Sequence, residues 1–345
     1  MGVNLKRLLR HTNPPLEHLS GKTIAVDAYN MIYQFLTSIR DRRGFLFTSQ
    51  DGVVSSHLIG LFYRLVNLME HGLKLVFVFD GKPVIEKTDT LAKRKELKEK
   101  AREEWVEALK RGDLETARSK AMQSARITPE IVESTKELLG HLKIPWVDAI
   151  EDGEAQASYM TMKGHCWAVA SQDYDSLLFG CTRLVRNLSI SRARIEKARK
   201  KGEPQKSHIE LIKAEEILKK LGVTREQLVD MAILIGTDFN PGVKGIGPKT
   251  SYRLIYRYGS IDKFPRKIVT KYGVDIPQLE ELRNIFLNPR VHDDYKLKWE
   301  KPDLDALKEF LCEKHNFSKE RVENTLKKIE RYRQVLEQKT LNGWS

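Results

Sequence analysis

The chain has 345 residues, 41% of them hydrophobic, so it is long enough to bury a sizeable core in one large domain or two fused lobes. No run of about 18 apolar residues occurs and the N-terminus lacks the apolar segment of a signal peptide, so we expect a cytoplasmic protein with no membrane span. The three cysteines are odd in number and widely spaced, which argues against a disulfide framework and against a Cys-rich zinc site.

The charge balance is basic. Sixty Lys and Arg residues against 47 Asp and Glu residues give a net charge of +13. Such an excess suits a polyanionic partner, because neutralising phosphates releases condensed counterions. A solvated, ion-paired surface has the same composition, so the arrangement of motifs must decide between the two interpretations.

Three apolar runs each lead to an aspartate: TIAVD to Asp27, LKLVFVFD to Asp80 and CWAVASQD to Asp173. Each is typical of a buried strand. Segments with helical periodicity, such as 55–70 and 128–142, lie between them. This alternation predicts an α/β fold with a central, mostly parallel, doubly wound sheet flanked by helices. Ligands of such sheets bind at the carboxyl ends of the strands, where the three aspartates fall.

Residues 86–125 are rich in Lys, Arg, Glu and Ala and contain few large apolar side chains, so no strand fits there. Two interpretations stay open. The segment is either a solvated helix with i,i+4 ion pairs, such as Glu96 with Lys100, or a helical arch over the site.

From about Ser207 the pattern is helical, so we divide the chain into an α/β core (1–206), a helical region (207–336) and a tail (337–345). The Gly-rich turn 242–250 is not a Walker A motif, because Pro248 precedes Lys249 and breaks the required G-K-[ST]. It fits a helix–two-turn–helix element, in which glycines let backbone N–H groups approach a DNA phosphate. A plain Gly-rich turn is the alternative.

Seven acidic residues occupy predicted strand ends or short turns. A single such acid is usually a helix cap or turn residue. Several converging carboxylates would repel one another unless divalent cations bound between them. Oxygen-only ligands select Mg²⁺ or Mn²⁺, and two such ions can hydrolyse a phosphodiester. The candidates are Asp27, Asp80, Asp152, Glu154, Asp173, Asp175 and Asp238.

Two pairs of these acids are close in sequence. Asp173 and Asp175 can share a metal either on one face of a strand or within one turn. Asp152 and Glu154 flank a glycine at a predicted helix start, where carboxylates suit the helix dipole. Plain N-capping is the alternative for the second pair.

Five blocks in this order, VDAYNMIYQFL, FVFDGKPVIEKTDTLAKR, DGEAQAS, SQDYDSLLFG and ILIGTDFNPGVKGIGPKT, resemble the flap endonuclease family. The match covers most of the chain. Within the family the chain resembles the archaeal branch most, since no long Lys-rich extension follows the last helix. The resemblance implies a monomeric 5′-flap endonuclease with 5′-to-3′ exonuclease activity. Such enzymes cut branched DNA at single-strand–duplex junctions in replication, during Okazaki fragment maturation, and in repair. Residues 1–206 would then form the nuclease core and residues 207–336 the DNA-binding region.

The resemblance also implies roles for the acids. Asp27, Asp80, Asp152 and Glu154 would surround one Mg²⁺, and Asp173, Asp175 and Asp238 the other, some of them through water. The family usually has Glu where this chain has Asp152. The shorter side chain must therefore reach further or bind through water, or else Glu151 supplies the missing reach.

Further DNA contacts follow from the same resemblance. Lys87 and Arg94 would contact the scissile phosphate from the base of the arch, two helical turns apart. Tyr33 would stack on a base near the cut, although a core tyrosine is nearly as compatible with the sequence. Gly245, Gly247 and Lys249 would hold the downstream duplex with the help of a bound K⁺.

The C-terminal residues resemble the peptide with which the family binds the sliding clamp. Gln338, Leu341 and Trp344 match it, while Ser345 stands where a second aromatic belongs. Weakened clamp binding is the expectation, and a disordered tail is the alternative.

Two other functions remain possible from the sequence. One is a catalytically weakened scaffold that binds DNA junctions, with Asp152 as its first sign of decay. The other is a related nuclease for bubbles or nicks. The compact arch segment favours flaps.

Overall fold

The computed structural model describes residues 2–82, 88–190 and 208–342. At its centre is a six-stranded sheet in the order β3-β2-β1-β4-β5-β6. The first five of these strands in the chain pair in parallel, and only β6 runs antiparallel, beside β5. The predicted central, mostly parallel sheet is therefore confirmed. The strands are β1 (Thr23–Asp27), β2 (Lys74–Phe79), β3 (Trp146–Asp148), β4 (Ala168–Ala170), β5 (Arg183–Arg186) and β6 (Glu210–Lys213).

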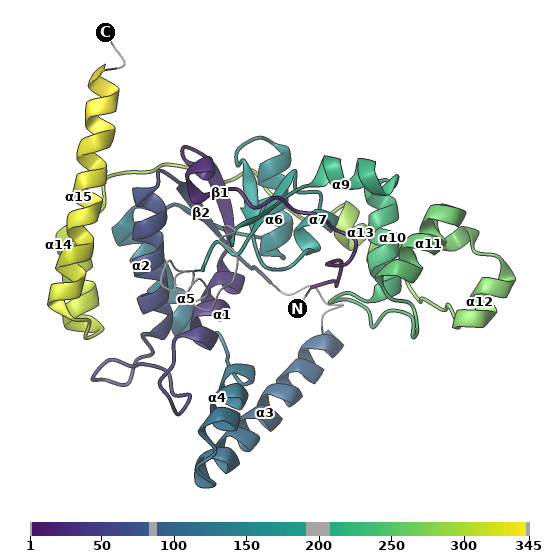
Figure 1. The fold of residues 1–345 in the computed structure, drawn as a ribbon, viewed down its shortest axis with the longest axis horizontal. Coiled ribbons are helices and arrows are strands. Elements are labelled where there is room, and N and C mark those ends of the chain that lie inside the picture. Colours follow the sequence, from purple (N-terminus) through teal and green to yellow (C-terminus); the bar gives the residue numbers. More distant parts are fainter. Residues whose placement is uncertain (1, 83–87, 191–207, 343–345) are drawn as a thin grey trace.

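The strands are continuous apolar runs because both faces of the sheet are covered. Side chains alternate between two cores: Ala25 and Val76 pack on one side, and Ile24, Val26 and Phe77 on the other. The helices that cover the second side are α1 (Ala28–Ser38), α2 (Ser56–Glu70) and α5 (Pro129–Leu142). Those that cover the first are α6 (Gly153–Met162), α7 (Asp175–Leu178) and α10 (Arg225–Ile235), as Figure 1 shows.

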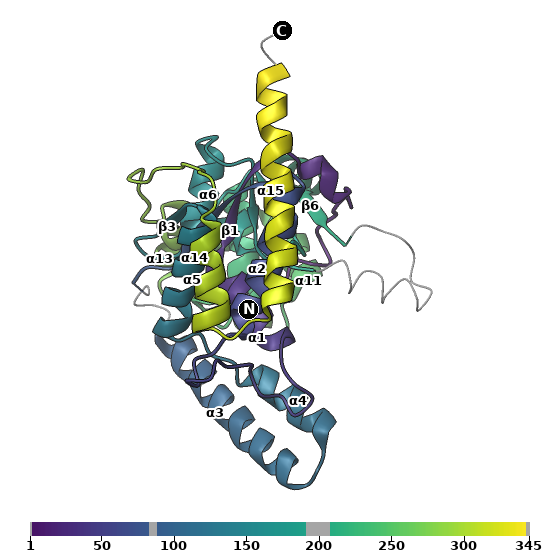
Figure 2. The ribbon, with the colours of Figure 1, turned by 90° about the vertical axis from the view of Figure 1, so that its left-hand side faces the viewer.

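Residues 88–123 form a helical hairpin of α3 (Thr88–Lys110) and α4 (Leu114–Gln123) that projects away from the sheet (Figures 1 and 2). The predicted helical arch is confirmed, and no strand lies within residues 88–125. The hairpin is held at its side by the loop that precedes α2: the Trp105 indole N–H donates to the Arg43 carbonyl (3.0 Å), and its ring meets Phe45 edge to face at 5.1 Å.

The helical lobe contains α9 (Ala214–Leu221), α10, α11 (Pro248–Tyr258), α12 (Arg266–Tyr272) and α13 (Leu279–Leu287), with a short 3₁₀ turn at Ile261–Lys263. The prediction that the chain is helical from Ser207 is wrong at its start, because Glu210–Lys213 is strand β6. Leu211 packs into one core and Ile212 into the other, an alternation that only a strand covered on both sides allows. The sheet therefore extends beyond residue 206.

Residues 289–303, here called the strap, have no regular structure and lead from α13 back to the opposite end of the molecule. The strap is tied down by side chains: Gln156 in α6 exchanges two hydrogen bonds with the His292 backbone (2.8 and 3.0 Å), and the Trp299 indole N–H donates to the Leu75 carbonyl (2.9 Å). It thus connects the helical lobe to α6 and to strand β2 of the sheet.

After the strap come α14 (Leu304–Lys308), a π-helical turn (Glu309–Lys314) and α15 (Lys319–Asn342), which lies along α2. A 3₁₀ turn at Leu16–Leu19 precedes β1. The backbone of α15 continues through Gln338 and Leu341, whose side chains lie outside the described residues, as does all of Trp344. In the part of the chain that the structure describes, no helix has the length and apolar character needed to cross a membrane.

Candidate active site

The strand order creates a topological switch point between β1 and β4. From β1 the chain proceeds to β2 and β3 on one side, and then returns to β4 on the other. Ligands of doubly wound sheets bind in the crevice at the carboxyl ends of the strands at such a point. Asp27 is the last residue of β1, Asp80 follows β2 directly, and Asp173 lies in the turn after β4. The three strands are adjacent and parallel, so these acids share one edge of the sheet.

The pair Asp173 and Asp175 lies in a turn, not on a strand, because β4 already ends at Ala170. Asp175 is the first residue of α7, and its Oδ1 accepts the Val3 N–H (2.7 Å). The Gly2 N–H donates to Asp173 Oδ1 (3.1 Å). The N-terminal residues thus hold both carboxylates in place.

The pair on α6 combines capping with a place in the site. Asp152 caps the helix, its Oδ1 accepting the N–H groups of Glu154 (2.9 Å) and Ala155 (3.2 Å). Glu154, in the first turn, accepts the Ser176 hydroxyl at Oε1 (2.6 Å). The helix-cap alternative is correct for Asp152, and it also fixes this carboxylate at the sheet edge.

Two glycines bring the backbone against the carboxylates. The Gly153 N–H donates to Asp80 Oδ1 (2.8 Å), and a Cβ at residue 153 would lie only 2.8 Å from the same oxygen. A Cβ at Gly2 would lie 2.6 Å from Asp175 Oδ1. Both positions therefore require glycine because the carboxylates approach so closely.

The acids strongly affect one another's ionisation. Burial raises the pKa of Asp27 well above its usual value, and the charges of Asp80, Asp152 and Asp173 raise it further. Burial also raises the pKa of Glu154, as do the charges of Asp27 and Asp175. The carboxylates thus form one electrostatic cluster.

Asp238 belongs to this cluster although it lies in the loop after α10. Burial raises the pKa of Asp175 to about 7, and among the neighbouring charges Asp238 contributes most, ahead of Asp173 and Asp152. The seven acids predicted from sequence are therefore brought to one place from the sheet, from α6 and α7, and from the helical lobe.

The donor set fits a hard divalent cation. Buried like charges are costly unless a cation neutralises them, and every candidate ligand here is a carboxylate oxygen. Within residues 2–82, 88–190 and 208–342, no three His, Cys, Asp or Glu side chains are preformed to hold a metal ion directly. Carboxylate oxygens are the donors that hard cations such as Mg²⁺ prefer.

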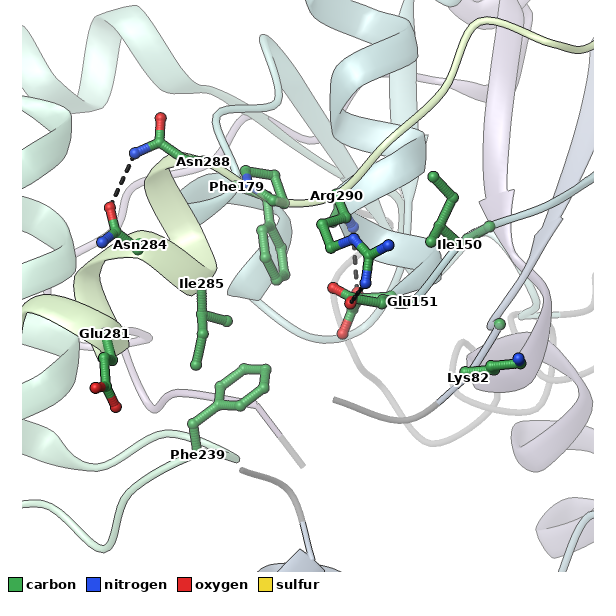
Figure 3. A pocket seen from close by; sticks show the side chains of 15 residues that line it. Lys82, Ile150, Glu151, Phe179, Phe239, Glu281, Asn284, Ile285, Asn288 and Arg290 are labelled. Atoms are coloured by element: carbon green, nitrogen blue, oxygen red, sulfur yellow. Dashed lines mark hydrogen bonds and ion pairs between the residues drawn. The ribbon is translucent and has the colours of Figure 1, made fainter. Parts of the chain in front are cut away.

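Glu151 does not fill the position of Asp152. Its Oε1 lies 3.1 Å from Arg290 Nη1, at the wall of a cavity of about 960 Å³ between the 149–152 loop and α13 (Figure 3). Asp152, by contrast, raises the pKa of Asp27, Glu154 and Asp175. Asp152 is the acid that faces the cluster.

Tyr33 on α1 is half-buried and faces the arch, where Lys98 Nζ of α3 lies 5.4 Å from the centre of its ring. It is not a core tyrosine. Of the two cations predicted at the arch base, Lys87 lies outside the described residues; Arg94 lies in α3, but its side chain is not among those described.

The Gly-rich turn joins α10 to α11 as predicted. Gly242 (φ +74°) passes so close to the Ile235 carbonyl that a Cβ there would overlap its oxygen. A Cβ added at Gly245 (φ +83°) or at Gly247 would have no atom within 4 Å, so the backbone at these two residues is open to a ligand. Lys249 is exposed in the first turn of α11.

Some site residues could not be found from the sequence. Three residues far away in the sequence hydrogen-bond to the acids. Gly2 and Asn30 donate to Asp173, which is 171 and 143 residues away, and Val3 donates to Asp175, which is 172 residues away. No local pattern marks such contacts. Only the polar residue Asn30, in the first turn after Asp27, offered a signal.

Two family models match this chain. That of the XPG N-terminal domain matches residues 1–101, and that of the XPG I-region matches residues 143–238. A doubly wound sheet with an acidic cluster at its switch point, in a chain with both of these regions, defines a nuclease of the XPG class that acts on DNA.

Relatives narrow the class further. The chain is 47% identical to Flap endonuclease 1 of Staphylothermus marinus over 99% of its own length and 98% of the relative's, and 47% identical to that of Pyrococcus abyssi over 100% and 98%. The solved flap endonuclease-1 from Methanococcus jannaschii superposes with a TM-score of 0.74 at 38% identity, covering 96% of this chain and 98% of that one. The chain belongs to the flap endonuclease 1 family, as its sequence blocks indicated.

A more distant structure extends the likeness. The catalytic core of Rad2 in complex with DNA substrate matches with a TM-score of 0.70 at 26% identity, over 94% of this chain and 97% of that one. The likeness therefore includes both the sheet and the helical lobe.

Proposed function

We propose that the protein is a structure-specific 5′-flap endonuclease, with 5′-to-3′ exonuclease activity, that acts on branched DNA in replication and repair. One observation carries the proposal: seven carboxylates converge at the switch point of a chain that aligns from end to end with proteins named flap endonuclease 1. The basic net charge of +13 suits a DNA partner. We further propose that the enzyme is a cytoplasmic monomer.

The acids would hold two Mg²⁺ ions, for which Mn²⁺ can substitute. Asp27, Asp80, Asp152 and Glu154 would hold one ion, and Asp173, Asp175 and Asp238 the other. Bound ions would activate a water molecule and neutralise charge on the phosphodiester. The protein's part is to fix the carboxylates: backbone N–H groups of residues 2, 3 and 153 hold three of them in place.

The arch and α1 would position the strand to be cut. Lys87 and Arg94 would stabilise negative charge on the scissile phosphate from the arch base. Tyr33 would stack on a base, which is supported by its half-buried position beside the arch. Stacking tolerates any sequence, so recognition would depend on the shape of the junction.

The helical region would grip the duplex. The open backbone at Gly245 and Gly247, next to Lys249, supports a contact with a DNA phosphate there. A bound K⁺ ion would help to hold the duplex. The α/β core would thus cut while the region after residue 206 binds, although β6 belongs structurally to the sheet. The tail at 337–345, through Gln338, Leu341 and Trp344, would bind the sliding clamp weakly.

Cleavage of a labelled 5′-flap duplex in Mg²⁺ tests the proposal, with a blunt duplex, a 3′-flap, a bubble and a nicked duplex as comparison substrates. We expect selective cutting at the flap base, and its loss in Asp80→Ala. If the bubble or the nicked duplex were cut in preference to the flap, the protein would instead be a related nuclease that is specific for bubbles or nicks.

A catalytically weakened scaffold is the second candidate, because Asp152 is one methylene shorter than the Glu usual in the family. Tight flap binding without cleavage in Mg²⁺ or Mn²⁺, together with cleavage by Asp152→Glu, would identify the scaffold. Cleavage by the unmodified chain would exclude it.

A further inference from the structure

Asn30 contacts two of the acids that meet at the switch point, Asp27 and Asp173. It occupies the first turn of α1, and its backbone N–H donates to Asp27 Oδ1 (2.9 Å). Its side-chain amide reaches across to the turn after β4, where Nδ2 lies 3.2 Å from Asp173 Oδ2 and Oδ1 lies 3.2 Å from the Gln172 backbone nitrogen. One residue thus contacts the acid at the end of β1 and an acid in the turn after β4.

The orientation of this amide follows from its partners. A backbone N–H can only donate, so the Gln172 N–H must face the oxygen of Asn30, and the NH₂ group must then face Asp173. The same logic orients Gln34: its Nε2 donates to Asn30 Oδ1 (2.6 Å), which leaves its Oε1 to accept the Ser189 hydroxyl. Each amide in this row therefore has a single consistent orientation.

The contacts fix the planes of two carboxylates. Asp173 is held at Oδ1 by the Gly2 N–H (3.1 Å) and at Oδ2 by Asn30. Asp27 is held at Oδ1 by the Asn30 N–H and at Oδ2 by the Ser171 hydroxyl (3.2 Å). The proposed function places Asp27 and Asp173 around different ions, so the residue joining them would determine how the two ligand sets are spaced.

We propose that Asn30 is a positioning residue that sets the orientation of Asp173 relative to Asp27, and so the affinity of the site for divalent metal. The inference rests on the proposed function. The cap of α1 does not depend on the Asn30 side chain, because the N–H that Asp27 accepts is a backbone group and any residue other than proline retains it. Residues that orient metal ligands typically change metal affinity by about 10- to 100-fold when replaced.

Two substitutions separate positioning from packing. Asn30→Ala removes the donor to Asp173 and both acceptor contacts. Asn30→Leu has nearly the same shape but can neither donate to Asp173 nor accept from Gln172 and Gln34, and it adds no charge beside the acids. Asn13→Ala is the control, since Asn13 is an asparagine whose side-chain amide also donates across a long sequence separation, to the Ile209 carbonyl (3.0 Å), away from the acids.

Four quantities would be measured on the full chain: the dissociation constant of Mn²⁺ by electron paramagnetic resonance, the dissociation constant of a 5′-flap DNA in Ca²⁺, and kcat and KM for flap cleavage in Mg²⁺. We expect both Asn30 variants to bind Mn²⁺ at least about 10-fold more weakly and to lose kcat in proportion. DNA affinity and KM should change less than about 2-fold, and Asn13→Ala should match the parent.

Two results would overturn the inference. One is Mn²⁺ binding by Asn30→Ala equal to that of the parent. The other is Mn²⁺ binding at the parental level by Asn30→Leu while Asn30→Ala binds more weakly, which would show that the side chain only fills space. If the parent itself neither binds Mn²⁺ nor cuts the flap, the proposed function fails, and this failure is visible before any variant is compared.

Discussion

At the scale of single residues, the site depends on glycines, which have no side chain and so let backbone N–H groups approach the carboxylates. Gly153 is the clearest case, because it lies between the cap residue Asp152 and Glu154 and donates to Asp80. If a Cβ were added to Gly153, it would meet Asp80 Oδ1 at 2.8 Å and the Val78 carbonyl oxygen at 3.3 Å. A methyl group there must displace the carboxylate.

We therefore predict that Gly153→Ala lowers flap cleavage about 10-fold or more, by moving a metal ligand. The expected change in stability is small, because alanine favours the helix by up to about 1 kcal/mol and this offsets part of the clash. Gly140→Ala on α5 is the matched control: a Cβ added there would have no neighbour within 4 Å, so it should stabilise the fold and leave cleavage unchanged. Equal rates for both variants would show that Asp80 tolerates displacement.

The residue scale also shows what sequence could and could not predict. Asp27, Asp80 and Asp173 were predictable because each follows an apolar run, and parallel strands bring their carboxyl ends together. Asp238 was a candidate because it lies in a short turn, but only the family resemblance linked that turn to the acids of the sheet. The donors Gly2 and Val3 could not be predicted, because contacts across more than 170 residues leave no periodic trace.

At the scale of elements, strong periodicity gave reliable predictions and its absence gave none. The helices predicted at 55–70 and 128–142 agree with α2 and α5, and the segment 86–125, predicted to be helical from its composition, contains α3 and α4. The strap at 289–303 has no period, yet it is fixed by side-chain bonds to α6 and to the sheet backbone. β6 was missed because four residues leading into an amphipathic helix continue its apparent pattern.

The arch has a contact with the loop before α2 that can be removed cleanly. We predict that Trp105→Ala, which deletes the hydrogen bond to the Arg43 carbonyl and the contact with Phe45, loosens the hairpin without unfolding the core. Limited trypsin digestion should cut within 88–123 several-fold faster, while the melting temperature changes little. Leu114→Ala, at an exposed apolar residue of α4, is the control and should leave the digestion rate unchanged.

At the scale of the whole molecule, stability should depend on pH through a buried histidine outside the acidic cluster. Burial, reinforced by neighbouring His315, lowers the pKa of His57 from 6.5 to about 3. The ring is packed between α2 and α5, with Nε2 2.9 Å from the Ser134 hydroxyl. Above the ordinary pKa the ring is neutral in both the folded and the unfolded chain. Below it the unfolded chain takes up a proton that the folded chain does not, so stability is lost as the pH falls towards the folded value.

We predict that the free energy of unfolding decreases between about pH 6.5 and about pH 4 by up to about 1.4 kcal/mol per pH unit from this group. The raised pKa values of Asp27, Glu154 and Asp175 act in the opposite direction, so the contribution of His57 must be isolated. Urea unfolding of the parent and His57→Gln at several pH values does this: the difference between them should shrink as the pH falls. A constant difference would mean that His57 titrates normally.

The net charge of +13 also acts at the scale of the whole molecule, and it is here that DNA binding and cleavage can be separated. Each phosphate that a cation neutralises steepens the dependence of binding on salt. If Lys249, exposed at the start of α11, neutralises one phosphate, Lys249→Ala should weaken binding of every duplex alike and reduce the salt slope by about 1. Lys296→Ala, at an exposed residue of the strap, is the control and should preserve the slope.

Because Lys249 lies on the helical lobe and not among the acids, kcat of the Lys249→Ala variant at saturating DNA should stay at the parental value. If kcat fell while the salt dependence of DNA binding stayed unchanged, Lys249 of the helical lobe would contribute to cleavage and not to binding of the duplex.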